Sequence, residues 1–253
     1  MPPLIVLVAI LSLAIAACNP TPAAAPALTD PKDIVTKGVT SLADAKTFEF
    51  TATFTGNVTA AQLGSFDLSS IKMNGALDLA NKKAKFSLDA PSLLGSKLEA
   101  IVVGDTAYYK VAGALAAGPH GQADKYTKFP VGRGSGSPVD MATDMTRLAA
   151  DIQAHLGELP SPLTKGANEK CGDLDCYHVS TVVSADQVRA IGGDASVDGE
   201  VTVDLWTRTT DYRPARMGLS VVSPSYGTFG VTFEIQYDVS VPVEAPAADQ
   251  IVQ

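Results

Sequence analysis

The most constraining feature of the sequence is a strict alternation of apolar and polar side chains in several separate segments. Residues 229–239 place Phe, Val, Phe, Ile, Tyr and Val at every second position. A similar two-residue period appears in residues 47–55, 71–79, 84–88 and 201–205. Successive side chains of a β-strand point to opposite faces of the sheet, so each segment predicts a strand with one apolar face.

Turn residues separate these segments into antiparallel neighbours. Asn81-Lys82 and Gly104-Asp105 each lie between two alternating runs and predict hairpins. Further strands are expected at 177–183 and 217–221. With about eight to ten strands, the chain predicts a mainly β fold of the α+β class, built on one large curved antiparallel sheet, a half-barrel.

A smaller number of segments have helical spacing. Asp30-Pro31 begins a short amphipathic helix, and residues 184–191 predict another. Between them, Met141 and Met145 lie on one face of a longer helix that ends near Gly157. We expect the helices to cover the concave face of the sheet, with the Met141 helix as a movable lid and a cavity between the layers.

The N-terminus has the pattern of a bacterial export signal. Residues 4–17 are apolar except for one serine and end in Ala16-Ala17-Cys18. This length suits a signal peptide better than a membrane-spanning helix. Small residues before a cysteine are typical of a lipobox, at which Cys18 would be acylated and become the mature N-terminus. A transmembrane anchor, or a secreted protein with an incidental cysteine, would be the alternatives.

The composition divides the chain into four parts. Residues 1–17 form the predicted signal peptide, and 18–30 are rich in Pro and Ala and favour an extended tether. Residues 31–245 form the predicted domain, and 246–253 a tail. The protein is thus expected to be exported and held by its lipid on the outer face of the bacterial cell membrane.

Charge and motif content exclude other classes. The net charge is -8, from 19 Lys and Arg against 27 Asp and Glu, which makes nucleic acid an unlikely partner. The chain has no Gly-x-Ser-x-Gly motif, and His120, His155 and His178 fall in three different elements. We therefore expect no enzymatic activity, no cofactor and no metal site.

Two cysteines lie five positions apart, at Cys171 and Cys176. In an exported protein this spacing favours a disulfide that closes a small turn. Zinc binding with His178 and a pair of free thiols are the alternatives.

The alternation also predicts which residues lie in the interior of the half-barrel. These apolar side chains would line the core and a hydrophobic cavity, although the pattern cannot separate one from the other. They are Phe48, Phe50, Phe54, Phe86, Val102, Met141, Met145, Phe229, Phe233 and Ile235.

The order of these features resembles a known family. After the lipobox, the tether and the Phe/Thr strand, the chain contains Tyr177-His178-Val179, the segment 201–207 with sequence VTVDLWT, Arg213-Pro214 and a closing Tyr237-Asp238. This order is similar to that of the mycobacterial lipoproteins of the LppX/LprG type. The same strand-turn-strand is similar to the LolA and LolB carriers and to regulators such as RseB, which share a half-barrel fold.

The resemblance implies a hydrophobic cavity that holds acylated lipids or glycolipids and carries them across the cell envelope. Its expected partners are the lipid itself, the membrane and a lipid exporter. The RseB-like alternative is a non-enzymatic domain that senses the state of the envelope through a membrane regulatory protein. The cysteine pair at Cys171 and Cys176 is not part of the mycobacterial pattern.

Overall fold

A computed structural model of the chain describes residues 27–60, 64–117, 125–130, 162–184, 186 and 198–252. Several predicted features therefore lie outside the described residues. They are the signal peptide, Cys18, most of the tether, the helix with Met141 and Met145, and most of the helix expected at 184–191.

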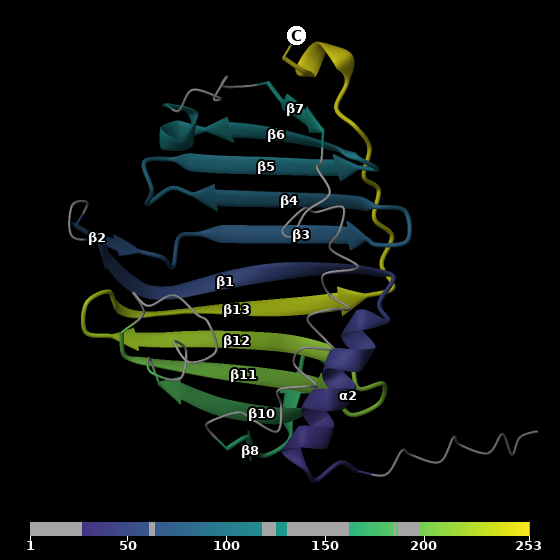
Figure 1. The fold of residues 1–253 in the computed structure, drawn as a ribbon, viewed down its shortest axis with the longest axis vertical. Helices are drawn as coiled ribbons and strands as arrows, with labels where there is room; N and C mark the ends of the chain where they lie inside the picture. The colour runs from purple at the N-terminus through teal and green to yellow at the C-terminus, as the bar shows by residue number, and fades with distance from the viewer. Residues whose placement is uncertain are drawn as a thin grey trace, which may run out of the picture.

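One antiparallel sheet of thirteen strands forms the body of the molecule (Figure 1). The fold class predicted from the alternation is confirmed, and the additional strands are short ones that carry too few residues to show a period. The strands are β1 (Thr47–Ala60), β2 (Gly64–Asp67), β3 (Lys72–Asp78), β4 (Lys83–Ala90), β5 (Ser96–Val103), β6 (Thr106–Ala112), β7 (Thr127–Pro130), β8 (Thr164–Lys165), β9 (Glu169–Cys171), β10 (Leu174–Ser184), β11 (Glu200–Arg208), β12 (Pro214–Ser223) and β13 (Gly227–Tyr237).

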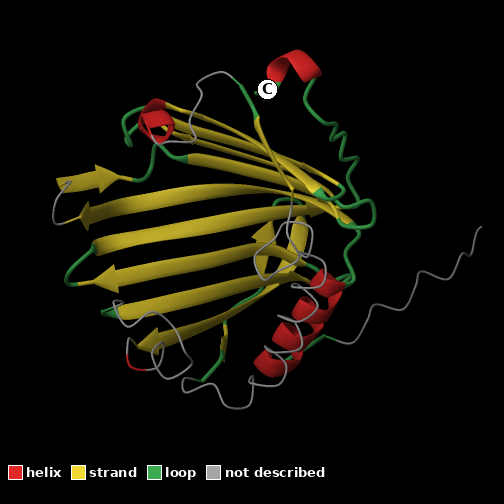
Figure 2. Cartoon of the chain, turned by 45° about the horizontal axis from the view of Figure 1, so that its top comes forward, coloured by secondary structure: helices red, strands yellow, loops and turns green. Residues whose placement is uncertain are grey.

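The first and last long strands join two halves of the sheet. The strand order is β7-β6-β5-β4-β3-β1-β13-β12-β11-β10-β8, with β2 beside β1 and β9 beside β10. The β1–β13 pairing runs from Phe48 opposite Tyr237 to Gly56 opposite Phe229. The sheet bends but does not close, because β7 and β8 form its two edges (Figure 2). This is the architecture of a half-barrel.

The registers place the alternating apolar side chains on one side of the sheet, which we call the apolar face. Val102, Ala84, Leu77, Phe48 and Tyr237 lie opposite one another on consecutive strands of this face. The other side, the polar face, carries mainly Thr, Asn, Lys and carboxylate side chains. The alternation along each strand is therefore the reason that the sheet has two chemically different faces.

One helix packs on the apolar face, across β10, β11 and β12. This helix, α2 (Pro31–Ala43), begins where the Asp30 side chain accepts a hydrogen bond from the Lys32 N–H at 2.8 Å. Ile34 is fully buried against Tyr177 and Val179. It is the sole α-helix with defined bounds among the described residues. Of the helices predicted to cover this face, α2 is therefore the one that the described residues show.

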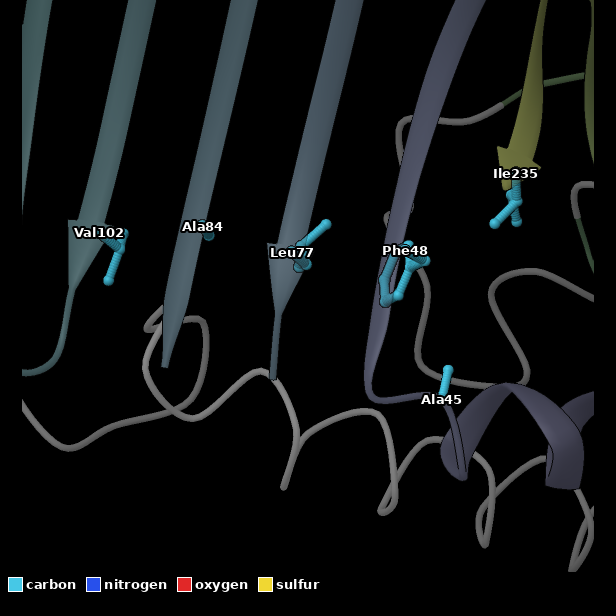
Figure 3. Close-up of a cluster of buried hydrophobic side chains, with 6 residues drawn as sticks. All are labelled: Ala45, Phe48, Leu77, Ala84, Val102 and Ile235. Carbon is cyan, nitrogen blue, oxygen red and sulfur yellow. The ribbon is translucent and has the colours of Figure 1, made fainter. Parts of the chain in front are cut away.

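A compact cluster closes one end of the apolar face, next to the end of α2 (Figure 3). Each member is less than 10% exposed and lies close to the end of its strand or just after α2. Its residues are Ala45, Phe48, Leu77, Ala84, Val102 and Ile235.

The end of the chain packs on the polar face instead of forming the predicted tail. Residues 239–252, which we call the C-terminal strap, include η2 (Ala248–Gln250), and Val243 is only 3% exposed. Val243 packs with Ile101 and Tyr108, and Tyr126 donates a backbone hydrogen bond to Gln250 at 2.8 Å. The Pro- and Ala-rich composition concealed this contact, because the valines of the strap meet an apolar patch on the otherwise polar face.

Candidate functional site

The predicted interior residues in the described part of the chain lie on the apolar face, but at two levels of burial. Phe48, Val102 and Ile235 are 7%, 2% and 8% exposed and belong to the closed cluster. The others in the described part are half-buried: Phe50, Phe54, Phe86, Phe229 and Phe233. The first group contributes to the core, and the second presents ring surface that remains open to contact. Met141 and Met145 lie outside the described residues.

Three phenylalanines form an aromatic cluster in the middle of this face. The Phe50 ring lies 6.2 Å from the Phe86 ring and 5.7 Å from the Phe233 ring, measured between centroids. The cluster exists because Gly75 lies opposite Phe50 in the register. A Cβ at position 75 would be 2.3 Å from the Phe50 ring, so the missing side chain makes room for it.

Two residues that the list of interior positions omitted extend the open surface toward α2. Val203 and Leu219 are cross-strand neighbours on β11 and β12 and are 39% and 37% exposed. Their positions follow the same alternation as the phenylalanines, so the signal was present in the sequence. What the sequence could not indicate was that these two side chains stay partly exposed.

The chemistry of the apolar face is uniform. In the eight consecutive strands from β6 to β11, and in β10 from Tyr177 onward, the described positions on this face carry no charged side chain. Such a surface offers dispersion contacts and exclusion of water but hardly any hydrogen bonds. It can bind an apolar ligand.

Two hollows of the described surface lie mostly on the polar face. One, of about 340 Å³, is lined mainly by polar residues, including Glu49, Asn74 and Glu234. A second, of about 510 Å³, is lined by Lys72, Lys97 and other residues of β3 to β6. Most of the lining residues belong to the polar face, which therefore presents polar grooves rather than an apolar cavity.

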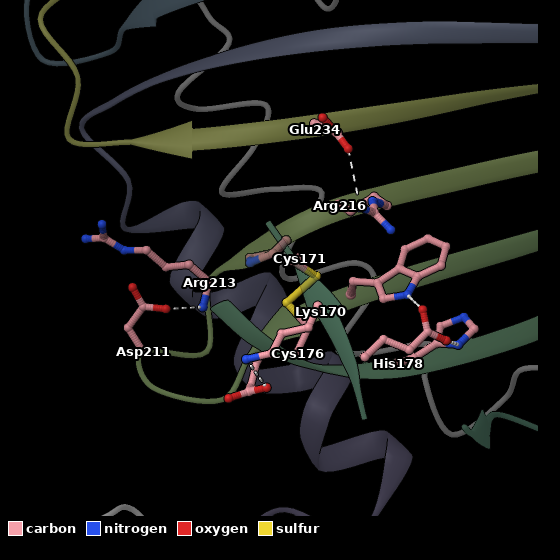
Figure 4. The surroundings of a disulfide bond; sticks show 12 residues. Lys170, Cys171, Cys176, His178, Asp211, Arg213, Arg216 and Glu234 are labelled. Carbon is pink, nitrogen blue, oxygen red and sulfur yellow. Dashed lines mark hydrogen bonds and ion pairs between the residues drawn. A yellow bond between two sulfur atoms is a disulfide. The ribbon is translucent and has the colours of Figure 1, made fainter. Parts of the chain in front are cut away.

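The predicted disulfide is present. Cys171 and Cys176 are bonded and close the β9–β10 hairpin (Figure 4). Cys176 is completely buried. Because the two sulfurs are bonded to each other, they do not act as thiolate ligands with His178 in this structure.

His178 lies on the polar face, held between two carboxylates. Its Nε2 is 2.8 Å from Asp204 Oδ1, and its Nδ1 is 3.0 Å from Glu169 Oε1. Its ring stacks on Trp206 at 4.5 Å, and the Trp206 indole N–H donates to Glu169 at 2.9 Å. Both ring nitrogens are occupied, so His178 joins β9, β10 and β11 (Figure 4).

A second charged cluster links β4, β5, β6 and the segment before β7. Glu99 lies 3.2 Å from Lys85 Nζ and 3.3 Å from Lys110 Nζ. Partial burial opposes ionisation of Glu99, but hydrogen bonds from Tyr126, Lys85 and Lys110 outweigh it and lower its pKa. Burial raises the pKa of Tyr126 to about 12, and the Glu99 carboxylate adds to the rise.

None of the described helices is long and apolar enough to cross a membrane. No family model and no curated protein sequence matches the chain.

Solved structures, in contrast, match the fold over most of its length. The lipoprotein LppX of Mycobacterium tuberculosis has a TM-score of 0.52 at 13% identity, covering 85% of this chain and 98% of LppX. LprF of Mycobacterium bovis has a TM-score of 0.55 at 14% identity, covering 86% and 97%. The chain has the LppX/LprG-type fold. The resemblance seen in the sequence is thus confirmed at the level of the fold.

A complex of MucA and MucB from Pseudomonas aeruginosa matches less well. Its TM-score is 0.39, and the chain covers 60% of the matched chain. This TM-score is too low to support any conclusion about this chain from MucB.

Proposed function

We propose that the protein is a lipoprotein of the bacterial envelope that binds acylated lipids or glycolipids on its apolar face and carries them across the envelope. The observation behind this proposal is the uncharged apolar face with half-buried aromatic and aliphatic side chains. The shared fold with the lipoprotein LppX supports it.

Acyl chains suit this surface better than other ligands do. Burial of apolar surface contributes roughly 25 cal/mol per Å², and each buried methylene about 0.8 kcal/mol. A sugar or phosphate would lose its hydrogen bonds to water on the same face and find few partners there. The acyl chains would therefore contact the phenylalanines, while the polar headgroup stays at the margin.

Anchoring belongs to the same proposal. Acylation of Cys18 would hold the protein on the outer face of the membrane, and the Pro- and Ala-rich tether would let the domain move above it. Replacement of Cys18 with serine should remove metabolically incorporated palmitate and release the protein from the membrane fraction. Unchanged labelling in the Cys18→Ser variant would contradict the anchor.

Lipid binding can be tested by native mass spectrometry of the full chain, produced in a bacterial envelope with Cys18 replaced by serine. Extraction with organic solvent then identifies what is bound. We expect lipid at defined stoichiometry. In the Leu219→Glu variant, a carboxylate on the apolar face should lower the bound fraction about tenfold, because burial of a charge in contact with acyl chains is unfavourable.

A matched control comes from the same strand. Val222 is 57% exposed on the polar face of β12, three residues from Leu219. The Val222→Glu variant should retain its lipid. A lipid-free parent protein that takes up none on incubation, or equal losses in the two variants, would contradict the proposed function. The first outcome would favour a sensing role with a membrane regulatory protein.

A further inference from the structure

Lysines gather on one half of the polar face. In the strands β3 to β7, this face carries six lysines and three carboxylates, in a chain whose net charge is -8. The lysines are Lys72, Lys83, Lys85, Lys97, Lys110 and Lys128, and the carboxylates are Asp78, Asp89 and Glu99. The local charge is therefore opposite in sign to the charge of the whole protein.

The larger groove of the polar face lies within this basic half. It has a volume of about 510 Å³, and its walls include Lys72, Lys97 and Lys110. Asp89 lies 3.3 Å from Lys97 Nζ, and Glu99 lies 3.3 Å from Lys110 Nζ. Within the described part of the chain, no carboxylate lies within ion-pair distance of Lys72. The groove thus has more positive than negative groups along its walls.

An exposed leucine lies at the turn beside this groove. Residues 91–95 connect β4 to β5, directly after Asp89 and Ala90 and before Lys97. Leu94 in this turn is 80% exposed. Its φ is +54°, in the left-handed region that L-residues rarely adopt. The fold gains no burial from this side chain, although the turn holds it in an unfavourable conformation.

We propose that the β4–β5 turn and the neighbouring lysines dock the protein onto a bilayer that contains anionic lipids. Leu94 would insert between the headgroups, and Lys72 and Lys97 would lie against their phosphates. An apolar tip beside basic side chains is the combination that favours the surface of an anionic bilayer. The inference goes beyond the proposed function, because it concerns a surface that the bound lipid does not use.

The position of the turn agrees with this orientation. The closed cluster with Phe48 and Val102 lies at the opposite end of the strands. Phe54 and Phe229, which are half-buried, lie toward the same end as the β4–β5 turn. Docking through Leu94 would therefore bring the end of the apolar face that carries Phe54 and Phe229 toward the bilayer.

A fluorescent reporter at the turn can test the inference. The full chain with the Leu94→Cys substitution is labelled with an environment-sensitive dye and reconstituted into vesicles of phosphatidylcholine alone or mixed with phosphatidylglycerol. We expect the fluorescence to rise about threefold and to shift to shorter wavelength in the anionic vesicles only. The parent protein, treated in the same way, gives the background labelling.

Two further variants decide the outcome. The Asp105→Cys variant carries the dye on the next turn, at the other end of β5, and its signal should not change. Adding Lys72→Gln and Lys97→Gln to Leu94→Cys should abolish most of the rise. Equal signals at positions 94 and 105, a rise that survives loss of both lysines, or the same rise in both kinds of vesicle would overturn the inference. None of these results depends on lipid bound to the apolar face.

Discussion

At the scale of single residues, Gly75 determines the shape of the aromatic cluster. Its Cα lies under the Phe50 ring, and a Cβ there would be 2.3 and 2.5 Å from two ring carbons. Gly75 is buried, and the Phe50 ring also contacts the rings of Phe86 and Phe233. The Phe50 ring therefore cannot move away from a new methyl group without disturbing these contacts. We expect the Gly75→Ala variant to lose about 2 kcal/mol in its free energy of unfolding, measured by urea denaturation.

A second substitution shows whether the clash is the cause. The Phe50→Leu change shortens the side chain that the new methyl group would meet. The double variant Gly75→Ala/Phe50→Leu should therefore be more stable than the sum of the two single effects indicates. Simple additivity would mean that the glycine is needed for another reason.

At the scale of elements, Glu99 joins three strands and the segment that receives the C-terminal strap. Hydrogen bonds from Tyr126, Lys85 and Lys110 lower its pKa against the effect of burial. A carboxylate with a lowered pKa stabilises the fold above its ordinary pKa of 4.5, and this contribution is lost as the pH falls. The free energy of unfolding should thus decrease in this acidic range.

Thermal melts of the Glu99→Gln variant at several pH values test this expectation. The variant should be less stable than the parent at neutral pH, and its stability should change less as the pH falls below 4.5. The Tyr126→Phe variant removes one donor and should give an intermediate result. Parallel pH curves for the parent and Glu99→Gln would contradict the role of this cluster.

At the scale of the whole molecule, a bound lipid should stabilise the half-barrel. A ligand that binds only the folded state adds about 2.7 kcal/mol when its free concentration is about 100 times Kd. Removal of lipid with organic solvent, followed by refolding, should therefore lower Tm, and returning the extracted lipid should restore it. The Leu219→Glu variant should show a smaller difference between the two forms, and an equal one would argue against lipid on the apolar face.

The sequence was sufficient to predict which side chains share a face of the sheet, but not which segments far apart in the chain contact each other. Alternation places Phe50, Phe233 and Val102 on one face, because side-chain direction is a local property of a strand. It could not separate buried Val102 from half-buried Phe233, since burial depends on the curvature of the sheet and on the position of α2. Composition likewise predicted a tail at 246–253, because the contact of Gln250 and Ile251 with Tyr126 joins segments that lie far apart in sequence.

The pairing of β1 with β13 has a consequence for how the protein is made. Phe48 lies opposite Tyr237, so the centre of the sheet forms only after nearly the whole chain has been synthesised. Contacts between such distant segments form late, and a chain that lacks them has two half-sheets with unpaired edges. A protein with this topology stays incompletely folded until its C-terminal strands are available. Such a delay would suit the export proposed for this protein, since an incompletely folded chain can pass through a membrane channel and its two halves can then assemble on the far side.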